Sequence, residues 1–164
     1  DGREYNYGYF NFFKDSGVNT VLLAHQGAST FSYFTSSVLK ANAFTVELGQ
    51  VKPFGENEMT NFQAIIEQLT ALIENRYIFD LSVNNDEFNI FRVVDEVIRH
   101  SKNNFTLNIG ADIANFSEFP LGFKLTSDDN SDYEFKAENQ AIVFPNAKVP
   151  VGNRVALIVN KSTI

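Results

Sequence analysis

The chain has 164 residues, of which 44% are apolar and 20% charged, so a packed core is expected and disorder is not. Its net charge of −7, with no basic run, argues against nucleic acid as a partner, although a locally positive pocket can still bind an anion. The absence of cysteine excludes disulfides and thiol catalysis, and no apolar run is long enough to span a bilayer.

The first half alternates helix-like and strand-like segments. Aromatic residues at helical spacing predict a helix over 5–14, and a short β-prone run follows at 18–24. A helix capped by Ser29 or Thr30 and a strand at 43–48 come next. The clearest helix covers 56–75. This alternation predicts an α/β sheet, with 18–24 and 43–48 as neighbouring parallel strands and the last helix packed on them.

Two apolar stripes are expected to be buried in that sheet's core. They are formed by Phe31, Phe34 and Val38, and by Phe62, Ile65 and Leu69.

The pattern changes near Arg76, where short β-prone runs between turn residues replace the helical spacing. We therefore expect residues 1–77 to belong to the α/β domain and residues 78–164 to form a small all-β domain. The predicted strands are 88–98, 105–109, 122–125, 133–136, 141–144 and 154–159.

Glu47 is the first candidate for chemistry. Glutamate is disfavoured in strands, yet this one ends an apolar run just before Gly49. Ligands of α/β proteins gather at the carboxyl ends of strands, where a partly desolvated carboxylate suits a general base. The alternative is an edge-strand glutamate that faces water.

Histidine and serine give weaker signals. His25 and His100 lie far apart and lack the spacing of metal ligands, so both are expected to be ordinary loop residues. Ser29 lacks the G-x-S-x-G context of a serine hydrolase.

Several short motifs around Glu47 and beyond it resemble those of bacterial succinylglutamate desuccinylases, a family related to the aspartoacylases. They follow one another in the family's order from about residue 20 to residue 159. The matching segments are Ser29–Ser32, Thr45–Gly49, Pro53–Asn57, Ile98–Ser101, the D-x-x-N-F-x-x-F-x-x-G pattern from Asp112 to Gly122, and Val143–Asn146.

The resemblance implies an α/β fold, part of a three-layer zinc carboxypeptidase-like sheet, followed by the all-β domain. It implies a cytoplasmic hydrolase that converts N-succinyl-L-glutamate and water to succinate and L-glutamate in arginine breakdown. Glu47 would be the general base beside one Zn²⁺ ion, which polarises the amide carbonyl. Ser29, Thr30 and Tyr33 are candidate substrate-binding residues.

The resemblance covers only the carboxy-terminal half of such an enzyme. The family's zinc ligands, an H-x-x-E pair and a later histidine, match no position here, so the metal and its ligands are expected from a missing amino-terminal half. This chain alone is then expected to be inactive. Two alternatives are a hydrolase of another N-acyl amino acid, as in aspartoacylase, and a non-catalytic β-rich binding or oligomerisation module.

Overall fold

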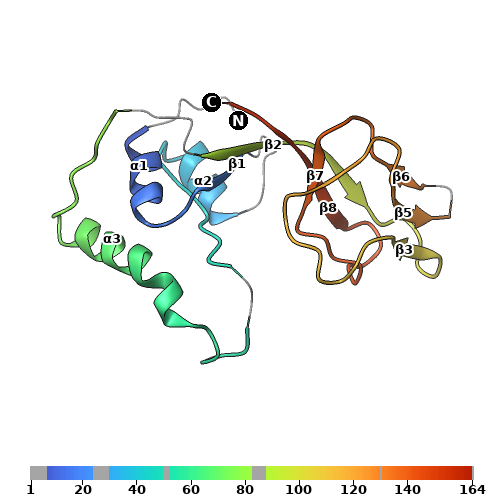
Figure 1. Ribbon diagram of the computed structural model, residues 1–164, viewed down its shortest axis with the longest axis horizontal. Coiled ribbons are helices and arrows are strands. Elements are labelled where there is room, and N and C mark those ends of the chain that lie inside the picture. The colour runs from blue at the N-terminus through green and yellow to red at the C-terminus, as the bar shows by residue number, and fades with distance from the viewer. Residues whose placement is uncertain (1–6, 24–29, 50–51, 83–87, 130, 164) are drawn as a thin grey trace. The chain divides into compact units, whose positions relative to one another are not determined.

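The computed structural model describes residues 7–23, 30–49, 52–82, 88–129 and 131–163. The chain divides into two compact units (Figure 1). The first comprises Asp1–Thr20 and His25–Phe88, and the second comprises Val21–Ala24 and Asn89–Ile164.

The described helices all belong to the first unit. Helix α1 covers Tyr7–Asp15 and helix α2 covers Phe31–Ser37. A 3-10 turn at Met59–Phe62 leads directly into α3, Gln63–Ile73. The helices predicted near 5–14 and 56–75 are therefore confirmed, with the second one beginning as a 3-10 turn.

Local chemistry fixes the ends of α1 and α2. Gly17 follows α1 with a φ of +80°, a conformation that glycine adopts without steric cost, and Val18 N–H donates back to the carbonyl of Phe13. At the start of α2, the hydroxyl oxygen of Thr30 accepts from the backbone N–H of Tyr33 at 3.2 Å. Thr30 is thus the cap, one of the two residues predicted for this position.

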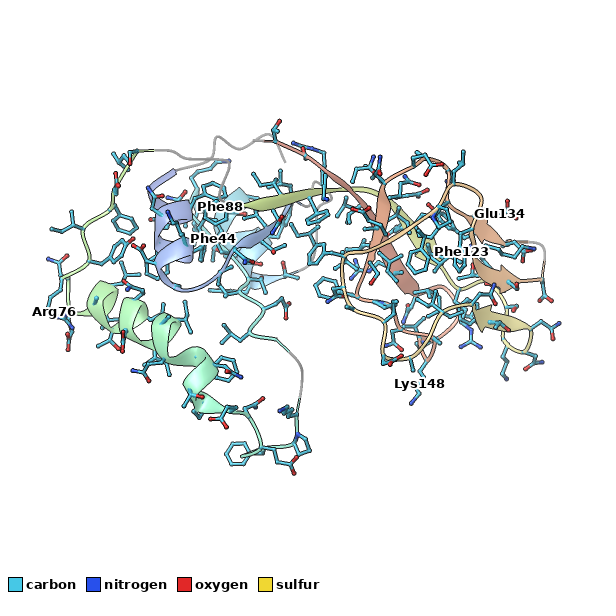
Figure 2. The ribbon with its side chains drawn as sticks, viewed as in Figure 1. Phe44, Arg76, Phe88, Phe123, Glu134 and Lys148 are labelled. Carbon is cyan, nitrogen blue, oxygen red and sulfur yellow. The ribbon has the colours of Figure 1, made fainter. Side chains whose placement is uncertain are left out.

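Aromatic contacts hold the first unit together (Figure 2). Tyr9 and Phe13 of α1 pack on Phe44, with ring centroids 5.4 and 4.9 Å apart. Tyr9 also meets Phe79, which in turn meets Tyr77 at 5.0 Å. Because such ring pairs combine apolar burial with favourable edge-to-face geometry, they anchor the extended segments on either side of α1.

Two expectations for this unit are wrong. Residues 43–48 form an extended segment without strand pairing, and the short run near 20 pairs with a strand of the second unit's sheet instead. On α2, Phe31 is 81% and Phe34 50% exposed, so the stripe predicted to be core is at the surface. Residues 43–48 have no hydrogen-bonded neighbouring strand among the described residues, and no described layer covers the apolar stripe of α2.

The second unit consists of two sheets, in which the pairings among the strands beyond residue 88 are antiparallel. The five-stranded sheet has the order β1-β2-β8-β7-β4, and the three-stranded sheet has the order β3-β5-β6. The described residues beyond 88 contain strands and turns but no helix, as predicted. The strands are β1 Thr20–Leu23, β2 Asn89–Ile98, β3 Phe105–Leu107, β4 Ser117–Phe119, β5 Lys124–Asp128, β6 Tyr133–Glu134, β7 Gln140–Val143 and β8 Arg154–Lys161.

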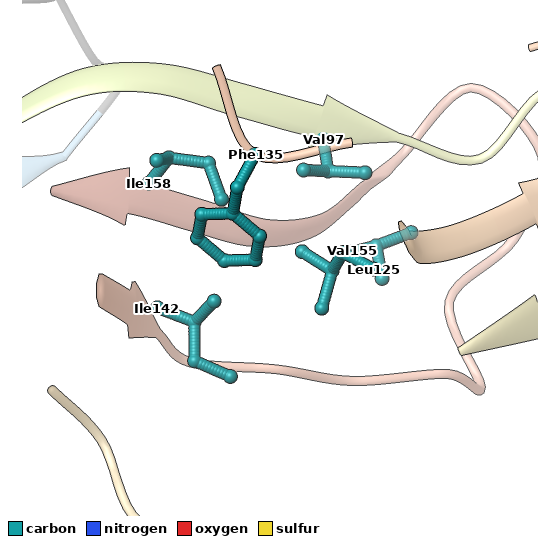
Figure 3. Packing of buried hydrophobic residues seen from close by; sticks show 6 residues of the cluster. All are labelled: Val97, Leu125, Phe135, Ile142, Val155 and Ile158. Atoms are coloured by element: carbon teal, nitrogen blue, oxygen red, sulfur yellow. The ribbon is translucent and has the colours of Figure 1, made fainter. Parts of the chain in front are cut away.

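Phe135 lies at the centre of this unit's core. It is 1% exposed and stacks on Phe119 with centroids 5.2 Å apart. Figure 3 shows its ring among aliphatic side chains from both sheets, and full burial of each contributes about 1.5–3 kcal/mol. These side chains are Val97, Leu125, Ile142, Val155 and Ile158.

An irregularity in β2 accounts for an exposed apolar residue and a small charged cluster. The register against β8 shifts between Val93 and Asp95, so Val94 is an unpaired extra residue that is 46% exposed. Beyond the shift, the carboxylate of Asp95 accepts hydrogen bonds from Tyr133 and Lys136. Burial and the nearby Asp95 charge raise the pKa of Tyr133.

Asp128 fixes the loop that follows β2. It is 1% exposed, and its two carboxylate oxygens accept the backbone N–H groups of His100 and Ser101. Although burial disfavours the charged form, these donors hold the pKa of Asp128 below its usual value. Arg99 completes the loop by donating to three backbone carbonyls and lying over the Phe105 ring at 5.0 Å.

We predict that Asp128→Ala lowers the free energy of unfolding by about 2–4 kcal/mol at pH 7, because the buried N–H of Ser101 and the partly buried N–H of His100 lose their acceptor. Since the folded pKa is depressed, this stabilisation is present above the unfolded value of about 3.9 and is lost as pH falls through the folded pKa. Urea denaturation followed by circular dichroism measures both effects. Glu138→Ala, at an exposed site, is the control. A variant as stable as the wild type at pH 7 would contradict the assignment.

Candidate active site around Glu47

The first unit contains an open cleft of about 460 Å³. Its wall is formed where the turn after α1, the segment that carries Glu47 and the approach to α3 come together. The lining residues are Ser16, Gly17, Val18, Glu47, Leu48, Gly49, Lys52, Asn57, Glu58, Asn61, Phe62 and Ile65.

Glu47 presents a free carboxylate to this cleft. It lies in the extended segment before Gly49, which has a φ of +95°, and it is exposed. Among the described residues, no side chain or backbone group forms a hydrogen bond or ion pair with it. Both oxygens are therefore available to accept a proton or a hydrogen bond from a ligand. The expected position at a strand end, partly desolvated, is not found in this chain.

Three further polar side chains line the same cleft and have no hydrogen-bond or ion-pair partner in the described part of the chain. They are the ammonium group of Lys52 and the carboxamides of Asn57 and Asn61. Glu58, in contrast, accepts a hydrogen bond from the hydroxyl of Thr60 at 2.9 Å. Within the described lining, the cleft thus offers one free acid, one free cation and two amides that both donate and accept.

Of the other predicted site residues, the two that the structure describes, Thr30 and Tyr33, do not line the cleft. Ser29 lies outside the described residues, Thr30 is used as the cap of α2, and Tyr33 is 37% exposed on that helix. A chain of hydroxyl groups nevertheless leads from the cap towards Glu47. Thr30 and Ser32 are 3.3 Å apart, and Ser32 lies 3.4 Å from Thr45, two residues before Glu47.

Lys52, Asn57 and Asn61 were not predicted from the sequence. Asn57 belongs to the Pro53–Asn57 motif, so the resemblance contained a signal for it. Lys52 and Asn61 carried none, because a single exposed lysine or asparagine is unremarkable until the fold places it in the same cleft as a carboxylate.

The described residues do not provide a zinc site. Within those ranges, no three His, Asp or Glu side chains come together as metal ligands. His100 is exposed in the second unit, where its backbone N–H binds Asp128, and His25 lies outside the described residues. Zinc takes three or four protein ligands, so the described residues do not fit the ion by themselves.

Several of the motifs beyond residue 98 have structural roles. Arg99 and Ser101 belong to the loop held by Asp128. The side-chain oxygen of Asn115 accepts the N–H of Phe144 at 2.7 Å, which joins two motifs about thirty residues apart. Phe144 has a φ of +57°, so this hydrogen bond stabilises a strained turn.

Two family models match the chain in succession. Residues 1–73 match the succinylglutamate desuccinylase/aspartoacylase catalytic domain, and residues 86–162 match the AstE/AspA barrel-sandwich hybrid domain. The first match contains the cleft with Glu47, and the second contains strands β2 to β8 of the two sheets. The chain therefore belongs to the succinylglutamate desuccinylase/aspartoacylase family.

Relatives named succinylglutamate desuccinylase are similar to this chain along most of its length. The succinylglutamate desuccinylase of Shewanella piezotolerans is 40% identical over 161 residues, which is 96% of this chain. That of Shewanella woodyi is 40% identical over 156 residues, or 95% of the chain. The chain spans 45% of the length of each of these relatives.

Solved structures agree with the fold. The succinylglutamate desuccinylase of Vibrio cholerae matches 95% of this chain and 45% of its own, with a TM-score of 0.82 and 31% identity. That of Chromobacterium violaceum matches 100% and 48%, with a TM-score of 0.80 and 30% identity. None of the helices in the described residues is long and apolar enough to cross a membrane.

We predict that the untagged chain binds Zn²⁺ far more weakly than structural zinc sites, whose binding free energies are about 10–16 kcal/mol. Among the described residues, His100 is the only histidine, and no three acidic or histidine side chains lie together as metal ligands. Isothermal titration calorimetry measures the affinity. Tight one-to-one binding that disappears in His25→Ala would contradict the prediction and identify a ligand.

Proposed function

We propose that this chain forms part of a hydrolase that cleaves N-succinyl-L-glutamate to succinate and L-glutamate, with Glu47 as the general base. The observation that carries the proposal is the free carboxylate of Glu47 in a cleft within the segment that matches the family's catalytic domain. The names of the relatives supply the substrate. The pathway, arginine breakdown in the cytoplasm, belongs to the same proposal.

The proposed chemistry is the addition of water to the amide carbonyl. A carboxylate beside the attacking water accepts its proton as the oxygen–carbon bond forms. The same carboxylic acid then gives a proton to the amide nitrogen as the carbon–nitrogen bond breaks, and the base is regenerated. Glu47 suits this role because no other group among the described residues occupies its oxygens.

Zinc dependence remains part of the proposal, with ligands that lie outside this chain. One Zn²⁺ ion would polarise the amide carbonyl when it is bound. Because the described residues do not fit the ion, the role of Glu47 is argued from its own carboxylate alone.

The apolar surface of the first unit supports a partner. Of the nineteen large apolar residues that are exposed in the described part of the chain, fifteen lie in this unit, among them Leu39 at 62% and Ile73 at 83%. Surfaces with so many exposed apolar side chains usually mark an interface. We propose that they contact the part of the catalytic domain that the relatives possess and this chain does not span.

The Glu47 assignment is tested in a graft, in which this chain replaces the matching 45% of the Shewanella piezotolerans enzyme. We expect Glu47→Gln to reduce kcat for N-succinyl-L-glutamate by about 10²–10⁴-fold, since the amide keeps the shape and removes the base. KM and zinc content should change little.

Glu56→Gln is the matched control, because Glu56 is exposed nearby but does not line the cleft. Near-normal turnover by Glu47→Gln would refute the general-base role, and loss of zinc would make Glu47 a ligand instead. Comparison of N-succinyl-L-glutamate with N-acetyl-L-aspartate distinguishes the two activities that the family name includes.

The partner proposal predicts that the chain alone enhances the fluorescence of the apolar dye ANS. Addition of the remaining amino-terminal portion of the Shewanella piezotolerans enzyme should reduce that signal, because the apolar side chains of α2 and α3 become covered. Phe31→Ser with Ile73→Ser should weaken the association by at least about tenfold, whereas Val151→Ser, in the second unit, should not. Analytical ultracentrifugation measures the complex. An unchanged dye signal would count against this partner.

A further inference from the structure

Lys52 differs from the other cations of the first unit that the structure describes. Lys40 donates to the carbonyl of Ser37 at 2.8 Å, and Arg76, labelled beside α3 in Figure 2, pairs with Glu74. Lys14 is also engaged in an interaction. Lys52 has no hydrogen-bond or ion-pair partner among the described residues, although two glutamates line the same cleft.

A free ammonium group in this cleft has a chemical consequence for the ligand. N-succinyl-L-glutamate has three carboxylate groups, one on the succinyl arm and two on the glutamate. Glu47 and Glu58 would repel such an anion, and Lys52 is the only Lys or Arg among the described residues of the lining. One cation at this position offsets part of the repulsion and provides up to three N–H donors to a carboxylate.

The carboxamides of Asn57 and Asn61 complete the set of donors. Asn57 lies five residues beyond Lys52, on the approach to α3, and Asn61 lies in the 3-10 turn. Neither side chain is occupied by another described group, so each can donate to a carboxylate oxygen or to the substrate amide. The described lining thus provides three donors, Lys52, Asn57 and Asn61, and Glu47 provides an acceptor.

We infer that Lys52 binds a carboxylate group of the acyl amino acid, with Asn57 and Asn61 as neutral donors beside it. The inference rests on the proposed function for the identity of the ligand. Lys52 is thereby assigned to substrate binding and not to proton transfer. Substitution of Lys52 should therefore change the affinity for the ligand and KM.

The test is direct binding of N-succinyl-L-glutamate to the whole chain, followed by ¹H–¹⁵N NMR. We expect the ligand to shift the Gly49 amide and the side-chain amides of Asn57 and Asn61, with a dissociation constant of about 1 mM. Lys52→Met should weaken binding about fivefold, as expected for one exposed ion pair, and Lys52→Arg should retain most of the affinity.

Two controls separate a specific contact from general charge. Lys40→Met removes one positive charge elsewhere on the same unit and should leave the affinity unchanged. The trimethyl ester of N-succinyl-L-glutamate has no carboxylate, so the wild type and Lys52→Met should bind it equally. Added salt should weaken the binding of unesterified N-succinyl-L-glutamate to the wild type more than its binding to Lys52→Met.

The inference is overturned if the wild type shows no shifts in the cleft, if Lys52→Met binds as tightly as the wild type, or if Lys40→Met is equally impaired. Since this measurement does not depend on turnover, it is distinct from a failure of the Glu47 assignment. In the graft, Lys52→Met should raise KM about fivefold and change kcat by less than about twofold. A loss confined to kcat would contradict the binding role.

Discussion

Strand β8 has a hydrogen-bonded strand on each side, β2 and β7, and its residues Val155–Val159 are buried. This two-sided pairing satisfies the backbone groups of the strand, so that its side chains can pack into the cores on both faces. The loops that carry Arg99, Asn115 and Asn146 are in turn attached to this sheet. Strand pairing is the constraint on which the order of the second unit depends.

The same constraint explains why the segment of Glu47 is not a strand. Residues 43–48 have strand-forming composition, but no described strand lies beside them to complete the hydrogen bonds. Their contacts come instead from Phe44 against the rings of α1 and from the Ser32–Thr45 hydroxyl pair. The segment that carries Glu47 is therefore held by side-chain contacts and not by strand pairing.

Local patterns in the sequence predicted most of the elements. Helical spacing, glycine positions and alternation of apolar and polar residues each determine local structure from residues that are close together in the sequence. Each of the six strands predicted in the second unit has a counterpart, but Ser117–Phe119 was missed because three residues with two polar ones carry almost no pattern. The paired neighbour of a strand and the layer over a helix depend on distant residues. For that reason the 43–48 strand and the burial of Phe31 were predicted wrongly.

The candidate site was predictable where a short motif carries the chemistry, as at Glu47. Lys52 and Asn61 became candidates only through their place in the cleft. The opposite happened at Thr30, which a motif suggested for substrate and which the fold uses as a helix cap. The motif residues Arg99 and Asn115 likewise proved to hold turns together. A matching motif therefore identifies the family more directly than it identifies the residues that touch a ligand.

The ends of the large sheet have a practical consequence for handling the protein. Its outermost strands are short, with four residues in β1 and three in β4, so they offer few unpaired backbone groups to another molecule. Stacking of chains strand upon strand, the route to fibrils, is thereby disfavoured at this sheet. Aggregation would instead proceed through the exposed apolar side chains of the first unit. Mild detergent or a low protein concentration would reverse it.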